Sequence, residues 1–337
     1  MTERHDGNQI QNDILDMFLH SESEAVSGEQ LSQQLGLSRT AVWKQIKQLE
    51  SYGFQFEASP RIGYRLTFAP DELMEPLVKM HVANESTLGH TVLWAPDRES
   101  TNQTATALAR DGSPHGIVVT ARQQSGGKGR QGRIWTSPSG GMWFSVLVRE
   151  PCALSQAADL TLLASVAVHR ALVSEGVQAQ IKWPNDILVH GKKVCGILAQ
   201  MRTDGETVEY AVIGIGINAN FSAELFPPEM REYATTILDT LGRPVFRPRV
   251  LGHIINELST IYRALEQGVG GFRTVREEWK ANAHTLGRKI QVRMGNTVIH
   301  GVAEDVDDNG VLILCDDSGE KHHIHSGEVL FSAAEQV

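Results

Sequence analysis

The spacing of hydrophobic residues changes twice along the 337-residue chain, and this constrains the fold more than any other feature. Residues 1–70 show helical spacing followed by a short strand pattern, and residues 90–283 alternate between strand-like and helix-like stretches. Residues 284–337 show short alternating strands with Gly-Asn and Asn-Gly turns. We therefore expect an α+β multidomain protein with three domains, in which residues 71–89 link the first two.

Composition excludes several classes of protein. A hydrophobic content of 41% is sufficient for buried cores, and a formal net charge of −9 argues against a chain that coats nucleic acid along its whole length. The first 20 residues are unlike a signal peptide, and no apolar run approaches the length of a membrane span. We expect a cytoplasmic protein with no membrane contact. The three cysteines lack CxxC spacing and indicate neither disulfides nor zinc: Cys152, Cys195 and Cys315.

A helix-turn-helix pattern follows a first amphipathic helix. Ser27 and Gln30 form a capping box that opens a short second helix, and Gly36 permits the turn that ends it. Ser38 is a good N-cap for a third helix with one apolar face. Residues 54–66 then alternate around a Pro/Gly turn, as a two-stranded wing would. The pattern predicts a winged helix-turn-helix domain over residues 1–70.

Positive charge is concentrated in the second half of this domain. Residues 38–66 hold five cations against two acids, a net charge of +3, whereas residues 1–37 hold one cation against seven acids, a net charge of −6. The basic part is the part that would enter a major groove, so we predict DNA binding by the helix-turn-helix at residues 27–46. The alternative is a small helical domain that binds protein or nothing. The predicted DNA contacts are Ser38, Arg39, Thr40, Lys44 and Lys47.

The stretch QQSGGKGRQGRIWTSPSGGMWFS combines glycines and cations in an unusual density. Glycines let a backbone approach a ligand closely, and Lys128, Arg130 and Arg133 supply positive charge for a phosphate. The stretch is not a Walker loop, because Gly129 follows Lys128 where Ser or Thr is required. We interpret it as an anion clamp, and the alternative is a solvated basic surface loop.

Lys182 lies in the stretch IKWPNDILVHGKKVCGILAQM. Pro184 favours an extended conformation for Trp183, which places Lys182 on a strand. The neighbouring residues are apolar, so the ammonium should be partly buried, and a buried unpaired cation is costly. Lys182 is therefore either paired with Asp186 or another neighbour, or available for an anionic substrate.

Three other patterns are interpreted as structural. The GIGINA stretch at residues 214–219 fits a dinucleotide fingerprint, but two prolines follow where its helix should continue, so we predict a strand end that lines a pocket. The KHHIH stretch at residues 321–325 has no group of cysteines or carboxylates beside it, and no metal site is expected. Trp43 on the third helix is expected to pack, partly buried, against the wing.

With these motifs, the chain resembles the bifunctional bacterial biotin–protein ligases that also repress biotin synthesis. The resemblance covers nearly the whole chain in the same three-part order. The glycine-rich loop together with KWPND is the most specific evidence, and the helix-turn-helix alone would be weak. The matching stretches are STNQ at 100–103, GKGRQGRIW at 127–135, KWPND at 182–186, GIGIN at 214–218 and the N-terminal SGEQLSQQLGLSRTAVWKQI.

The resemblance implies a fold and a reaction. The fold would comprise the winged helix-turn-helix, a central mixed α/β class II synthetase-like catalytic domain at 90–283, and a small SH3-like β-barrel at 284–337. The reaction would join biotin and ATP, with Mg²⁺, into biotinyl-5′-AMP. The adenylate would then acylate a lysine of the biotin carboxyl carrier domain of acetyl-CoA carboxylase or a similar carboxylase. The adenylate-bound form would also dimerise on operator DNA as a repressor.

The resemblance also implies roles for individual residues. Lys182 and Arg130 would be catalytic, with Lys182 bridging the carboxylate and the α-phosphate. The family usually has Arg at position 128, and Lys keeps the charge but loses the forked geometry. Biotin would contact Ser100, Thr101, Asn102, Gln124, Lys128, Gly129, Arg130 and Lys182. The adenylate would contact Arg130, Arg133, Trp135, Asn185 and Asn218.

No residue is expected to form a dedicated metal cage. Three other functions are compatible with the motifs: a ligase that no longer binds its operator, a regulator with an inactive sensor domain, and a lipoate-type acyltransferase. The operator sequence, the carrier protein, the affinities and the strength of the dimer do not follow from the sequence.

Overall fold

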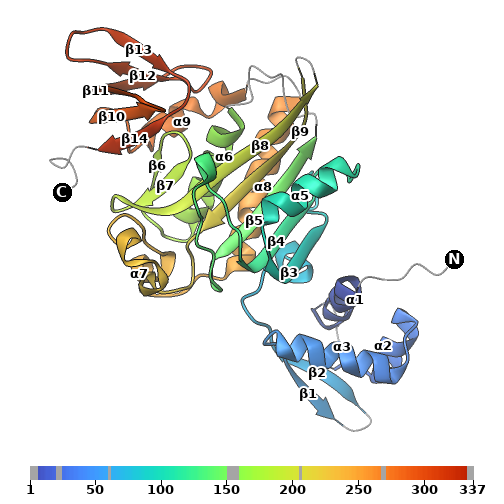
Figure 1. The fold of residues 1–337 in the computed structure, drawn as a ribbon. Helices are drawn as coiled ribbons and strands as arrows, with labels where there is room; N and C mark the ends of the chain where they lie inside the picture. Colours follow the sequence, from blue (N-terminus) through green and yellow to red (C-terminus); the bar gives the residue numbers. More distant parts are fainter. Residues whose placement is uncertain are drawn as a thin grey trace.

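The computed structural model describes residues 7–19, 25–59, 62–149, 159–204, 207–266 and 271–331. Figure 1 shows three units in chain order: a helical unit with a hairpin, a large central sheet with helices on both faces, and a small β unit. The predicted α+β organisation is confirmed. Within the described residues, no helix combines the length and apolar character that crossing a membrane requires. Arg61 and Cys152 lie outside the described residues.

The first unit is a winged helix-turn-helix, and its predicted caps are confirmed. Gln30 N donates to Ser27 Oγ at 3.1 Å and Ser27 N donates to Gln30 Oε1 at 2.9 Å. Gly36 has a φ of 63° at the turn, and Ser38 Oγ accepts from Ala41 N at 3.2 Å. The core includes Ile14, Leu15, Leu31, Val42, Ile46 and Leu49, each at most 1% exposed. The elements are α1 (Gly7–Leu19), α2 (Gly28–Leu35), α3 (Arg39–Ser51), β1 (Gln55–Ser59) and β2 (Gly63–Phe68), with the two strands antiparallel.

The segment predicted to link the first two units is packed. It contains the short helix α4 (Glu75–Lys79), whose Leu77 and Val78 are buried against the core. Asn12 Nδ2 on α1 donates to Glu75 Oε2 at 2.8 Å in a buried hydrogen bond. The winged unit therefore rests on α4 through apolar contacts and a satisfied polar contact.

The central unit is built on a sheet with strand order β3-β4-β5-β9-β8-β7-β6. Strands β3 and β4 are parallel, and the other neighbouring pairs are antiparallel. The strands are β3 (Val92–Arg98), β4 (Val118–Gln124), β5 (Met142–Arg149), β6 (Ala179–Lys182), β7 (Asp186–Val189), β8 (Lys192–Asp204) and β9 (Thr207–Ile217). Figure 1 places α5 (Thr101–Arg110) on one face, and α6 (Asp159–Ser174) with α8 (Arg247–Glu266) on the other.

Both faces of the central sheet are covered by apolar side chains. Phe144, Val146 and Ile215 pack on the face of α6 and α8, whereas Val119 and Leu147 pack under α5. A sheet buried on both faces requires strands with near-continuous apolar runs, such as MWFSVLV and YAVIGIGI. Shorter elements complete the unit: η1 (Arg130–Gly132), η3 (Ala223–Leu225), η4 (Pro228–Met230), α7 (Ile237–Leu241), η5 (Gly271–Thr274) and α9 (Arg276–Ala281).

The third unit is an antiparallel sheet with strand order β13-β12-β11-β10-β14. Its buried face carries Ile290, Val292, Ala303, Leu312 and Leu314. The small β unit predicted from the alternating pattern is therefore present, and its last strand runs beside the β6–β7 hairpin in Figure 1. The strands are β10 (Lys289–Met294), β11 (Thr297–Val306), β12 (Leu312–Cys315), β13 (Lys321–Ile324) and β14 (Glu328–Phe331).

Candidate active site

One cavity of about 790 Å³ brings the motifs of the sequence together. It is bounded by the N-terminus of α5, the glycine-rich loop, the β6–β7 hairpin, the strands β8 and β9, and β14 of the third unit. Every residue predicted to bind biotin or the adenylate lines it, although their individual roles remain predictions: Ser100, Thr101, Asn102, Gln124, Lys128, Gly129, Arg130, Arg133, Trp135, Lys182, Asn185 and Asn218.

The α5 end of the cavity is a network of neutral polar groups. Thr101 N and Oγ1 donate to Gln124 Oε1 at 2.8 and 3.1 Å. Ser145 Oγ lies 2.8 Å from Thr101 Oγ1 and 2.6 Å from Asn102 Oδ1. Asn102 Nδ2 donates to Gln200 Oε1 at 3.1 Å. Side chains fixed in this way present donors and acceptors in defined directions, which suits a small neutral ring with its own amides.

Gly214 and Gly216 line the cavity at the end of β9, as predicted. A Cβ at Gly214 would overlap Asn102 Oδ1, and a Cβ at Gly216 would lie 2.5 Å from Trp135 Nε1. The two glycines therefore allow Asn102 and the Trp135 indole to lie directly against the strand. The resemblance of GIGINA to a dinucleotide fingerprint is accidental, because the glycines belong to a strand and no helix follows directly.

The glycine-rich loop is closed on itself and on the third unit. Gly129 N donates to Arg133 O at 2.8 Å, which forms a tight turn around η1. Arg130 Nη1 donates to Asn185 Oδ1 at 3.1 Å and to Gly327 O at 3.4 Å. Arg133 forms a bidentate ion pair with Glu328, in which Nη1 donates to Oε1 at 2.7 Å and Nη2 donates to Oε2 at 2.5 Å. The hydrogen bonds between this pair raise the pKa of Arg133 and lower the pKa of Glu328.

Lys182 is the last residue of β6 and lines the cavity. Its Nζ lies 5.2 Å from the centroid of the Phe331 ring, and it makes no hydrogen bond or ion pair with any of the described residues. Burial lowers its pKa, an effect that the nearby Asp186 carboxylate partly opposes. The pairing with Asp186 considered from the sequence is not formed, and Asp186 Oδ1 instead lies 2.6 Å from Lys193 Nζ.

The nucleotide end of the predicted site is partly occupied by structural contacts. Trp135 lines the cavity and packs edge-on against Trp143, with ring centroids 6.3 Å apart. Asn218 is 3% exposed, and its Nδ2 donates to Thr235 O at 3.1 Å. Asn185 Nδ2 donates to Ile197 O at 2.9 Å. Both asparagines thus hold backbone in place at the cavity wall.

Sequence reasoning missed the contribution of the third unit and of Lys193. Gly327, Glu328 and Phe331 lie far along the chain from the other lining residues, so no local motif connects them to the site. Lys193 follows KWPND closely in the sequence. Its proximity to the Asp186 carboxylate depends on the register between β7 and β8, which the sequence does not reveal.

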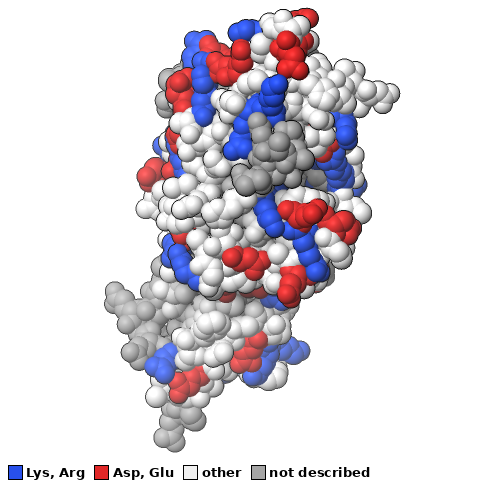
Figure 2. Space-filling model, turned by 90° about the vertical axis from the view of Figure 1, so that its left-hand side faces the viewer, with Lys and Arg blue, Asp and Glu red and all other residues white. Residues whose placement is uncertain are grey.

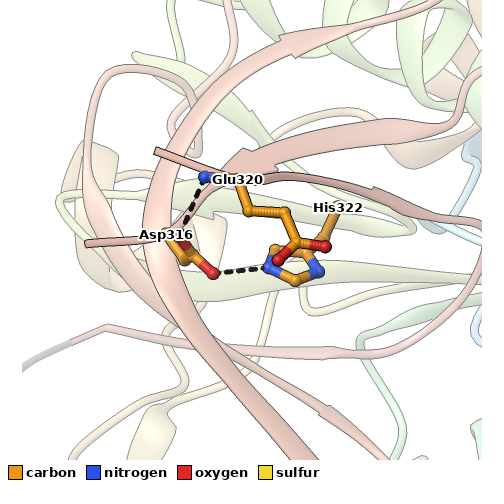
Figure 3. Close-up of side chains that lie close together, drawn as sticks. All are labelled: Asp316, Glu320 and His322. Atoms are coloured by element: carbon orange, nitrogen blue, oxygen red, sulfur yellow. Dashed lines mark hydrogen bonds and ion pairs between the residues drawn. The ribbon is translucent and has the colours of Figure 1, made fainter. Parts of the chain in front are cut away.

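A group of possible metal ligands occurs away from the cavity, at the turn between β12 and β13. Figure 3 shows the side chains of Asp316, Glu320 and His322 close together. Their possible ligand atoms lie within 4.8 Å of one another. The expectation that no carboxylates lie beside the KHHIH stretch is therefore wrong. Asp316 accepts hydrogen bonds from Ser318 N at 2.9 Å, Glu320 N at 3.0 Å and His322 Nε2 at 2.8 Å, which hold its pKa well below the usual range. These bonds close a tight turn, and we assign the group to structure.

The predicted DNA-binding residues Ser38, Arg39, Thr40, Lys44 and Lys47 are all exposed around α3. Arg39 pairs with Glu29 at 3.1 Å and Lys47 with Glu50 at 2.6 Å, both at the surface. The predicted packing of Trp43 against the wing is wrong: its side chain is 48% exposed and Lys47 Nζ lies 6.0 Å from its ring centroid. On the face drawn in Figure 2, acidic and basic side chains are interspersed.

The central fold and its cavity define a ligase of the biotin/lipoate type, carried on one chain with a DNA-binding module. The model of the biotin/lipoate A/B protein ligase family matches residues 94–218. An HTH domain model matches residues 10–65, and the model of the biotin protein ligase C terminal domain matches residues 285–332.

Whole-length relatives carry both functions in their names. The bifunctional ligase/repressor BirA of Bacillus spizizenii is 37% identical over 95% of this chain and 98% of its own length. That of Escherichia coli is 28% identical over 94% of this chain and 96% of its own. A solved biotin protein ligase from Aquifex aeolicus, in complex with biotin and ATP, is 26% identical, with a TM-score of 0.61 over 72% of this chain and 98% of its own. The chain belongs to the bifunctional ligase/repressors of the biotin/lipoate A/B protein ligase family.

Proposed function

We propose that this protein activates biotin with ATP to biotinyl-5′-AMP and transfers the biotinyl group to a lysine of a biotin carboxyl carrier protein. The observation that carries the proposal is the position of Lys182 in a cavity with a neutral polar end and a cationic loop. Its ammonium is buried and has no hydrogen-bond or ion-pair partner among the described residues, only the Phe331 ring at 5.2 Å. A buried cation of this kind is stabilised by an incoming anion.

The chemistry of adenylation suits these residues. Attack of the biotin carboxylate on the α-phosphorus brings two anions together, forms the acyl–phosphate bond and releases pyrophosphate. Lys182 stabilises the negative charge that grows on the phosphorus oxygens, and Arg130 supports it from the loop. Thr101, Asn102 and Gln124 hold the ureido ring by hydrogen bonds. The loop then excludes water from the mixed anhydride until the carrier lysine attacks its carbonyl carbon and AMP leaves.

Mg²⁺ is the expected companion of ATP. Two of the three carboxylates that line the cavity are paired, Asp186 with Lys193 and Glu328 with Arg133, and the third is Glu229. These residues fit a metal that arrives on the triphosphate and keeps water and phosphate ligands, rather than one held by a protein cage. When bound, the ion neutralises charge on the phosphates.

A direct assay tests the ligase proposal. The protein is mixed with ATP, Mg²⁺, radiolabelled biotin and an apo biotin carboxyl carrier domain, and labelled carrier is counted after denaturation. We expect labelled carrier with biotin and not with lipoate. Absence of adenylate and of labelled carrier would favour a regulator with an inactive sensor domain, whereas a product with lipoate would favour a lipoate-type acyltransferase.

We also propose that the adenylate-bound form acts in the cytoplasm as a dimeric repressor of biotin synthesis genes. The exposed face of α3 and the names of the whole-length relatives support this role. An operator with two-fold symmetry requires two winged units, so dimerisation and DNA binding should occur together. Fluorescence anisotropy with operator and random DNA, at physiological salt and with biotinyl-5′-AMP, tests it. Equal affinity for both DNAs would leave a ligase without operator binding.

A further inference from the structure

Lys182 and Asp186 face each other across the β6–β7 hairpin, yet they do not pair. The two residues are direct partners in the antiparallel register, where side chains lie on the same face and close together. Opposite charges in such positions attract, and both of these groups are largely removed from water. The absence of a salt bridge between them therefore requires a competing partner.

Lys193 is that partner. Its Nζ lies 2.6 Å from Asp186 Oδ1 and 5.1 Å from the centroid of the Trp135 ring, so the ammonium lies between a carboxylate and an aromatic face. The backbone is shaped to admit it. The β7–β8 ladder shifts register between Ile187 and Leu188, and Gly196 stands directly opposite Asp186.

Gly196 leaves the space through which the Lys193 side chain crosses the strand. A Cβ on Gly196 would lie 3.1 Å from Lys193 Cε, 3.2 Å from its Nζ and 2.9 Å from the Trp135 ring. The other cations near Asp186 are held elsewhere, Arg130 by Asn185 and Gly327 and Arg133 by Glu328. The Lys193 side chain is thus held in the site, where it forms an ion pair with Asp186, the carboxylate that Lys182 would otherwise contact.

We propose that Lys193 is a positioning residue, which keeps Lys182 available for the substrate anions by holding Asp186 in an ion pair. The expected effect on catalysis rests on the proposed ligase function. The expected change in pairing among Lys182, Asp186 and Lys193 does not. Without the Lys193 charge, Asp186 would pair with Lys182, and the catalytic ammonium would be turned away from the reacting groups.

Four variants separate this role from a merely structural one: Lys193→Met, Asp186→Asn, the double variant, and Lys192→Met as the matched control. Lys192 is the neighbouring exposed lysine, does not line the cavity, and donates to Arg231 O at 3.1 Å. Methionine keeps the length of the lysine side chain and its contact with Trp135 while removing the charge. Circular dichroism and thermal melting verify that each variant is folded.

The first measurement is the reactivity of the Lys182 amine and needs no enzymatic activity. Acetic anhydride acylates the unprotonated amine, so the pH dependence of Lys182 labelling, read by mass spectrometry, reports its pKa. The charged groups that face Lys182 are Asp186, Lys193, Glu328, Arg133 and, beyond Phe331, His284 and Arg288. The four variants change only the first two, whose effects on Lys182 are opposite in sign.

We expect the midpoint of Lys182 labelling to rise in Lys193→Met, to return near the wild-type value in the double variant, and to fall in Asp186→Asn. Lys192→Met should match the wild type. Equal midpoints in Lys193→Met and the wild type would overturn the proposal, because Asp186 would then not have moved to Lys182.

The second measurement is adenylation. Lys193→Met should lower kcat by about tenfold or more with little change in the KM for biotin, since a partly buried ion pair now holds Lys182. The double variant should recover most of that loss. A loss in Lys193→Met that the double variant does not recover would mean that Lys193 contacts the nucleotide itself, and would also overturn the proposal. Wild-type protein that makes no adenylate would refute the proposed function, whereas the labelling midpoints would still report whether Lys193 and Asp186 act on Lys182.

Discussion

Arg122 donates from Nε to Glu72 Oε1 at 2.7 Å and joins the central sheet to the segment that follows the wing. Its guanidinium lies 5.7 Å from the Tyr52 ring and 5.6 Å from the Trp94 ring, and Tyr52 is the C-cap of α3. The end of α3 is thus held against β4, two residues before Gln124 of the candidate biotin site.

Arg122→Met should lower the free energy of unfolding by about 1–3 kcal/mol, because a buried carboxyl loses its partner. Burial already raises the pKa of Glu72, so the variant should be destabilised most at high pH, where the carboxyl is forced to ionise. Urea denaturation at several pH values measures this. Arg202→Met, which removes an exposed pair with Glu209, should change stability by no more than about 0.5 kcal/mol. Similar losses in both variants would contradict the expectation.

Lys182→Met should strongly slow adenylation and stabilise the protein. Removing a donor that acts on developing charge lowers kcat by about 10²–10³. Removing a buried, unpaired ammonium should raise the free energy of unfolding by about 1 kcal/mol. Pyrophosphate exchange and urea denaturation measure the two effects. Unchanged pyrophosphate exchange would show that Lys182 has no part in the reaction.

Glu328→Gln should loosen the glycine-rich loop from the third unit. An exposed ion pair contributes up to about 1 kcal/mol, so trypsin should cleave the loop cations up to about fivefold faster. The folded-state pKa of Glu328 is lowered, chiefly by the hydrogen bond from Arg133, so the pair stabilises the loop above the ordinary Glu pKa and is lost as pH falls through the lowered value.

A protease active in acid, such as pepsin, should therefore reveal faster loop cleavage of the wild type as the pH falls, and little such change in Glu328→Gln. Glu209→Gln, which breaks an exposed pair elsewhere, is the control. Identical cleavage of all three proteins would show that the Arg133–Glu328 pair does not hold the loop.

Gly214→Ala should weaken biotin binding. The new methyl group would overlap Asn102 Oδ1 and displace the amide, at a cost of about 1–3 kcal/mol. Gly214 is not among the glycines with positive φ, so alanine is compatible with its backbone and the fold should survive. Calorimetric titration with biotin measures the change, and ATP binding in the same variant serves as the control. Unaltered biotin affinity would mean that Asn102 does not contact the ligand.

Lys44→Ala should weaken operator binding and leave ligation unchanged. Loss of one phosphate contact lowers the slope of log affinity against log salt by about one. The measurement is anisotropy across a salt series, beside the carrier assay. Lys289→Ala, an exposed lysine of the third unit paired with Asp317, is the matched control. If the slope of log affinity against log salt stays at the wild-type value, Lys44 does not contact the operator DNA.

Much of the architecture could be predicted because the decisive signals are local. The Ser27–Gln30 capping box, the turn at Gly36 and the strand before Pro184 depend on a few adjacent residues. The relation between Asp186 and Lys193 could not be predicted, since it depends on a register shift and on the space left by Gly196. The packing of Trp43 against the wing is predicted wrongly, because helical spacing indicates the direction of a side chain but not whether another element lies there to contact it.

The placement of β14 over the cavity has a consequence for protein synthesis. Phe331 lies beside Lys182 and Glu328 anchors the loop, and both belong to β14, which is translated after the loop and the central strands that line the rest of the cavity. A ribosome-bound chain that has not yet released this strand has an unsealed pocket, from which an activated acyl group would be lost to hydrolysis. A closed site therefore forms only after β14 has been translated, and a chain that stops before it would consume ATP without retaining the acyl group.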